Sequence, residues 1–117
     1  MPARLKVLDP ARLAEAHDSG DTKALVKHYL AVLEERAPGR SVEVRVPPYA
    51  AVQVVPGVRH TRGTPPAVIE TDAETWLALA TGRTTWRQAV SDGAVRASGE
   101  RTDLTSYLPL DLVQDGA

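Results

Sequence analysis

A chain of 117 residues is the length of one domain and can bury a single hydrophobic core. Hydrophobic residues make up 43% of the chain and charged residues 25%, which is ordinary for a globular protein. The formal net charge of -1 argues against non-specific binding to nucleic acid. Because there is no cysteine, disulfides, thiolate zinc sites and a thiol nucleophile are excluded.

Two helices are predicted first along the chain. Asp9 followed by Pro10 is typical of a helix start and predicts a helix to about His17. A longer helix is expected to begin at Asp21 and to end before Pro38. Its expected apolar face consists of Val26, Tyr29, Leu30 and Leu33. Its expected outer face carries Lys23, Lys27, Glu34 and Glu35.

Three strands are predicted in the middle of the chain. Residues 41–46 alternate, so that Val42, Val44 and Val46 face one way. Residues 50–55 are more apolar and are expected to form a more central strand, and residues 67–71 form the third. The polar segment 58–66 between them is a candidate for a further paired strand.

Two short helices and a last strand are predicted next. Asp72, or Thr71 in a capping box, begins a helix that carries Trp76, Leu77 and Leu79. Thr85 caps a second helix, which ends at Gly93. The second helix carries Trp86, Ala89 and Val90.

The last predicted strand has Val95 and Ala97 facing inward. A short helix is expected over residues 103–108, and residues 109–117 are expected to be a loose tail. Together these elements predict a single α+β domain over residues 1–117. Its sheet is expected to be mostly antiparallel, with four to five strands and with helices packed on one face.

Catalytic motifs are largely missing. His17, His28 and His60 lack metal-ligand spacing and are interpreted as surface residues, so neither a metal nor a cofactor is expected. Glu70 is a weak candidate for an acid or base, and Asp72 is more simply explained as a helix cap. The sequence therefore indicates a protein that is not an enzyme.

One polar cluster is the best candidate for a charged site. Arg59, His60 and Arg62 lie within four residues and could bind a carboxylate or a phosphate. The competing interpretation is a solvated hairpin whose arginines pair with nearby carboxylates. Trp76 and Trp86 are open to a similar choice, because they either fill the core or border an apolar cavity.

Several long strings resemble one known family. They include Pro47 to Gln53, His60 to Pro66, Thr75 to Gly82 and Val95 to Glu100. These strings are similar to those of the small sterol-carrier-protein orthologues of actinobacteria, from about residue 8 to 110. The resemblance implies an α+β fold in which helices cover a mostly antiparallel sheet. It also implies non-enzymatic binding or transfer of lipids in a tunnel between the two.

The leading hypothesis is therefore that the protein binds a fatty acyl chain, a lipid or a sterol-like molecule between helices and sheet. The residues expected to line that site are Leu30, Val44, Val54, Arg59, His60, Arg62, Ile69, Trp76, Leu77, Leu79, Trp86 and Val90. The alternative is a domain with a solid core that binds another protein or a second copy of itself. The lack of a long apolar run favours a cytoplasmic location and no membrane span.

Overall fold

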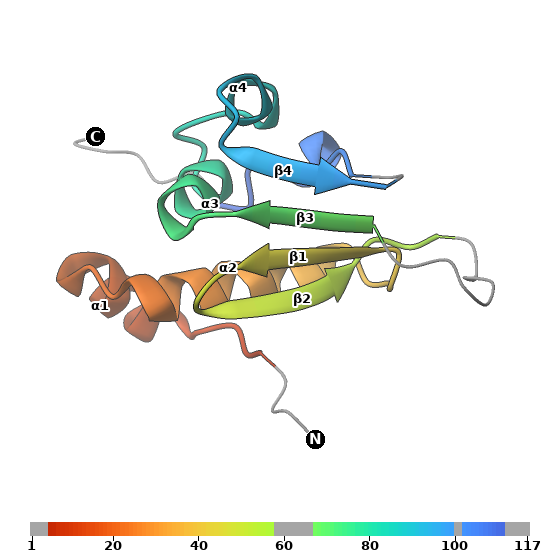
Figure 1. Cartoon of the computed structure of the whole chain (residues 1–117). Helices are drawn as coiled ribbons and strands as arrows, with labels where there is room; N and C mark the ends of the chain where they lie inside the picture. The colour runs from red at the N-terminus through yellow and green to blue at the C-terminus, as the bar shows by residue number, and fades with distance from the viewer. Residues whose placement is uncertain (1–4, 58–66, 100–101, 112–117) are drawn as a thin grey trace.

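The computed structural model describes residues 5–57, 67–99 and 102–111. These residues form one four-stranded sheet with helices behind one of its faces (Figure 1). The elements in chain order are α1 (Pro10–Ser19), α2 (Thr22–Arg36), β1 (Val42–Val46), β2 (Ala50–Val54), β3 (Ala67–Thr71), α3 (Ala73–Ala80), α4 (Trp86–Ser91), β4 (Val95–Ser98) and the 3-10 turn η1 (Thr105–Tyr107).

Each helix begins at a side chain that accepts a hydrogen bond from the backbone of its first turn. The accepting oxygens belong to Asp9, Asp21, Asp72 and Thr85, at distances between 2.7 and 3.1 Å. Such caps satisfy N–H groups that have no partner within the helix. The predicted helix starts are confirmed, and Asp72 rather than Thr71 is the cap of α3.

The sheet is mixed, which corrects the prediction of a mostly antiparallel sheet with up to five strands. The strand order is β2-β1-β3-β4, and β1 pairs with β3 in parallel. Val42 at the start of β1 pairs with Val54 at the end of β2 and with Ala67 at the start of β3. β1 therefore lies between β2 and β3 in the sheet, although β2 and β3 are consecutive in the chain. The prediction assumed that consecutive strands pair, which would have placed β3 beside β2. In the structure β3 pairs with β1 instead.

The strand order also corrects the predicted position of β2 within the sheet. Its apolar sequence indicated a central strand, yet β2 lies at one edge of the sheet and β1 lies inside it. Ala51 and Gln53 are exposed, whereas Val52 and Val54 are buried, so β2 buries one face only. One edge of β2 has no neighbouring strand among the described residues and retains backbone groups that are free to bond.

The core lies between the sheet and the helices. Val42, Val44 and Val46 of β1 are all fully buried, as the alternation predicts. The helix α2 lies across them and packs against β2, α1 and α3. Because small valines line the sheet, larger side chains from the helices fill the space above it. These include Trp76, Tyr29, Leu30, Leu33 and Leu79.

The ends of the sheet and of the chain differ from expectation. Ala97 was expected to face inward beside Val95, but it is exposed because β4 is an edge strand whose last residues no helix covers. By contrast, Leu110 falls in the segment that was expected to be loose and is buried. The N–H groups of Leu110 and Asp111 both donate to the carbonyl of Ala80 at 2.9 Å. The chain is therefore docked on α3 up to residue 111.

Candidate functional site

Half of the side chains predicted to line a cavity are fully buried between the sheet and the helices. Leu30, Val44, Val54, Ile69, Trp76 and Leu79 are each at most 1% exposed. Three surface clefts formed by the described residues include none of these six side chains in their walls. These six side chains thus come together as the sequence predicts, and they do so by packing on one another.

The other predicted lining residues are more scattered. Trp86 is 9% exposed, Leu77 is half-buried, and Val90 is 46% exposed on the outer side of α4. Val90 points outward because Trp86 and Ala89 occupy the buried side of this six-residue helix. Arg59, His60 and Arg62 lie outside the described residues.

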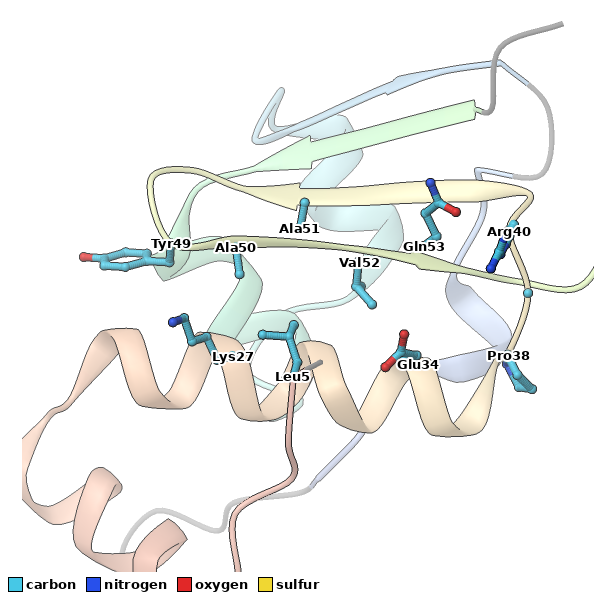
Figure 2. A pocket seen from close by; sticks show the side chains of 11 residues that line it. Leu5, Lys27, Glu34, Pro38, Arg40, Tyr49, Ala50, Ala51, Val52 and Gln53 are labelled. Carbon is cyan, nitrogen blue, oxygen red and sulfur yellow. The ribbon is translucent and has the colours of Figure 1, made fainter. Parts of the chain in front are cut away.

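A groove of about 720 Å³ lies between α2 and the edge of β2 at which no strand of the described ranges pairs (Figure 2). We call it the α2–β2 groove. Its walls are formed by Leu5, by Lys27 and Glu34 of α2, and by residues 38–40 and 49–53. Its volume falls within the range of small-molecule sites, roughly 300–1,000 Å³. Figure 2 shows the side chains of Ala50 and Val52 directed toward α2.

The groove has an apolar middle and charged flanks. Leu5 lies against α2 between Lys27 and Glu34, with its side chain directed toward β2 (Figure 2). Lys27 also points toward β2, and no residue in the described part of the chain pairs with its ammonium group. Glu34 and Arg40, at the other end, each have an interaction of their own. Lys27 is therefore the cation available to an anionic group in the groove.

Residues 5–9, which we call the N-terminal strap, cross α2 and carry Leu5 to the groove. The strap is tied to α2 by one hydrogen bond, because the N–H of Leu8 donates to Nδ1 of His28 at 2.9 Å. His28 is only 4% exposed, which corrects its interpretation as a surface residue. It is buried because the strap covers the side of α2 that faces away from the sheet, where Leu8 is half-buried.

A second polar network holds the C-terminal end of the described chain. The hydroxyl of Tyr29 donates to a carboxylate oxygen of Asp111 at 3.0 Å and lies 3.0 Å from Nε2 of His17. Since the one hydroxyl proton is given to Asp111, Nε2 of His17 carries the proton that it donates to Tyr29. This network links α1, α2 and the C-terminal segment.

The environment of α2 shifts two ionisation equilibria. Burial lowers the pKa of His28, and the nearby His17 lowers it further, whereas Asp111 and Glu35 act in the opposite direction. Burial and the hydrogen bond to Asp111 raise the pKa of Tyr29. Tyr29 is therefore a permanent hydrogen-bond donor, and His28 is neutral when its Nδ1 accepts from Leu8.

Removing the Tyr29 hydroxyl is expected to destabilise the protein. Tyr29→Phe deletes a hydrogen bond to a carboxylate and one to an imidazole, and a bond to a charged group contributes about 1.5–3 kcal/mol. We expect the free energy of unfolding in urea to fall by about 2 kcal/mol. Tyr107→Phe is the matched control, because the Tyr107 hydroxyl makes no hydrogen bond within the described ranges. Equal stability of the two variants would contradict the network.

The sequence did not point to several residues of the groove and of the networks beside it. Lys27 and Glu34 were expected to be solvated outer residues, and Leu5 and Asp111 carried no pattern at all. The burial of His28 could have been predicted from its spacing. It lies three residues after Leu25 and four before Val32, so these three residues form one stripe on α2. Leu25 is buried and Val32 half-buried, so this stripe extends the apolar face around the helix.

Other kinds of site find no support in the described ranges. No group of three or more His, Asp or Glu side chains there could hold a metal ion. Asp72 is occupied as the cap of α3. Glu70 lies on the outer face of the sheet, opposite Arg45 of β1 and Arg96 of β4. None of the helices in these ranges has the length and apolar character needed to cross a membrane.

Comparison with known proteins places the chain in a family. A family of bacterial SCP orthologues matches residues 18–110, which cover all the elements from α2 to η1. The chain belongs to this family. Membership of these SCP orthologues confirms the resemblance seen in the sequence, and it suggests lipid binding or transfer at the level of the family. A search of curated proteins found no match.

Proposed function

We propose that the protein binds a molecule with one apolar chain and an anionic head group, without performing chemistry on it. The observation that carries this proposal is the α2–β2 groove, in which Leu5, Ala50 and Val52 lie beside Lys27, whose ammonium group has no partner among the residues that the structure describes. An aliphatic tail would lie along β2, and a carboxylate would contact the Lys27 ammonium. The family suggests a lipid ligand. The apolar middle and charged flanks of the groove favour a lipid that has both an apolar tail and a charged head group.

The open shape of the groove limits the affinity. Complete burial contributes about 0.8 kcal/mol per methylene, so a half-buried tail of about 15 methylenes gains on the order of 6 kcal/mol. Association costs about 4–15 kcal/mol in lost freedom of motion. The tail alone is therefore insufficient. The ionic contact to Lys27 and any further covering of the tail, such as Leu5 provides, decide whether the complex forms.

We prefer the groove over the interior because the six predicted lining side chains that are fully buried pack on one another and border none of the three surface clefts. A tail could enter between helices and sheet only if α2 or α3 moved away from the valines of β1. One observation favours such an interior site: the buried indole Nε1 of Trp76 has no hydrogen-bond partner in the described ranges. A ligand carbonyl there would satisfy it. The experiment below separates the two locations.

Binding of hexadecanoate is the test, followed by native mass spectrometry and by calorimetry. Ala50→Trp fills the groove and is expected to weaken binding at least tenfold. Ala97→Trp makes the same change on the other edge strand, outside the groove, and is expected to bind as the wild type does. Lys27→Ala is expected to weaken binding of hexadecanoate but not of hexadecanol, which has no charge.

Two results would overturn the groove as the binding site. If Ala50→Trp binds normally and hexadecanoate shifts the emission of Trp76 and Trp86, the ligand occupies the interior. If neither the wild type nor any of the variants binds hexadecanoate or hexadecanol, the protein is not an acyl carrier.

A second candidate function is binding to another protein or to a second copy. The edge of β2, which pairs with no strand among the described residues, favours it, because an edge strand can add a strand from a partner. Sedimentation of the protein at increasing concentration would reveal self-association. A monomer that binds hexadecanoate would favour the carrier function instead.

A further inference from the structure

The N-terminal strap carries Leu5, part of the groove wall, and is tied to α2 next to the groove. Leu8 is three residues from Leu5, at most about 11 Å along the chain. The bond from the Leu8 N–H to Nδ1 of His28 is the hydrogen bond that ties residues 5–8 to α2 within the described ranges. Lys27, which borders the groove, is the residue before His28. The strap and the groove therefore share one short part of α2.

We propose that His28 is a proton-operated latch, in which protonation of Nδ1 releases the N-terminal strap and opens the α2–β2 groove. A neutral imidazole accepts at Nδ1 and carries its proton on Nε2. A protonated imidazole carries protons on both nitrogens, so two N–H groups would face each other at the present 2.9 Å. The bond to Leu8 then cannot persist. The importance of the latch for ligand binding rests on the proposed function, whereas release of the strap does not.

The surroundings of His28 place its protonation below the ordinary pKa of a histidine. The groups that influence it electrostatically are His17 of α1, Glu35 of α2 and Asp111 of the C-terminal segment, and the ring of Tyr29 lies against it edge-on at 4.7 Å. Burial dominates and lowers the pKa of His28 below its ordinary value of 6.5. The latch is therefore closed at neutral pH and opens only as the pH falls below that value.

The same shift predicts how stability depends on pH. Between the lowered pKa of folded His28 and the ordinary 6.5 of the unfolded chain, only the unfolded chain takes up the proton. His28 therefore costs stability as the pH falls through that window, and has no effect above it. Release of the strap limits this cost, because it exposes the imidazole to water before the domain unfolds.

Release competes with apolar packing. Leu5 and Leu8 are half-buried against the core, and their contacts hold the strap without the hydrogen bond. By contrast, Val7 is 41% exposed and points to solvent. A label at position 7 therefore reports on the strap without replacing a packed side chain. Because the chain has no cysteine, Val7→Cys provides a single attachment site.

The experiment follows a spin label on Val7→Cys between pH 8 and pH 5 while NMR of the imidazole nitrogens reports protonation of His28. As the pH falls, we expect the mobile fraction of the label to rise at least threefold. The midpoint of this rise is expected to coincide with the midpoint of His28 protonation. In His28→Asn the side-chain oxygen still accepts from Leu8 but does not titrate, so the label is expected to stay immobile. In His17→Asn the transition is expected to persist, because the latch itself is intact.

The outcomes separate the latch from the proposed function. An immobile label on a protonated His28, an unchanged transition in His28→Asn, or unfolding of the domain before His28 takes up a proton would each overturn the latch. If His28→Asn does not fold, the coincidence of the label and imidazole midpoints in the wild type still decides. Hexadecanoate is then titrated at pH 8 and pH 5. A mobile label without binding at either pH would retain the latch and overturn the carrier function.

Discussion

Leu79→Glu is expected to unfold the domain. Leu79 is 1% exposed at the centre of the packing between α3 and the rest of the core. An unpaired carboxylate there costs several kcal/mol, and loss of the leucine side chain costs a further 1.5–3 kcal/mol or so. The total is comparable with the entire stability of a domain, roughly 5–15 kcal/mol. Circular dichroism of the purified variant should show loss of the cooperative melting transition.

The matched control for this change is Val90→Glu. It introduces the same carboxylate on the neighbouring helix, at a side chain that is 46% exposed. Its effect is expected to stay within about 0.5 kcal/mol of the wild type. If Leu79→Glu melted like Val90→Glu, the orientation of α3 with Leu79 toward the core would be incorrect.

Gly39→Ala is expected to be strongly destabilising. A Cβ at this position would lie 2.1 Å from the carbonyl oxygen of Val55 and 2.4 Å from its carbonyl carbon. These atoms cannot move aside easily, because Val55 donates to Ala37 at 2.7 Å and accepts from Ser41 at 3.1 Å. Gly39 also has a φ of +155°, which L side chains rarely adopt. We expect a loss of about 3–6 kcal/mol, combining backbone strain and overpacking.

Gly20→Ala is the control for the backbone contribution alone. Gly20 has a φ of +68°, and nothing lies within 4 Å of an added Cβ. The left-handed conformation costs a non-glycine residue about 1–2 kcal/mol. The free energies of unfolding of the two variants in urea should therefore differ by about 1–5 kcal/mol. Equal losses would mean that the close approach of the 37–41 connection to Val55 is not maintained.

The damage from Gly39→Ala would extend to the proposed site. Residues 38–40 form one end of the α2–β2 groove, and the bonds around Val55 hold this connection against the end of β2. A shift there would change the separation of α2 and β2. We therefore expect the folded fraction of the Gly39→Ala protein to bind hexadecanoate more weakly than the Gly20→Ala protein does.

Much of the local structure could be predicted from short patterns. Asp9, Asp21, Asp72 and Thr85 mark helix starts because a cap depends only on the next three residues. The alternating valines of β1 predict a strand with one buried face, since side chains alternate along any strand. On α3, Trp76 and Leu79 share the buried face because residues three apart lie on one side of a helix.

The candidate site was harder to predict, because it depends on pairs of residues far apart in the chain. The sequence around His28 is charged and indicates a solvated residue. In the folded chain the N-terminal strap, whose Leu8 is twenty positions earlier, covers it. The Tyr29 hydroxyl meets a carboxylate 82 residues later. No spacing rule links such residues, and only their packing in the folded chain decides whether a polar side chain is solvated or buried.

By itself, the sequence determined the family, the α+β class, the helix starts and the aliphatic core, because all of these follow from residue types and from spacings of a few positions. Only the tertiary structure decided that β3 pairs with β1, which leaves β2 at the edge and creates the groove beside α2. The physical reason is that strand order depends on where the long connections cross the sheet. That crossing is decided by the free energy of contacts between distant segments, which no local pattern contains.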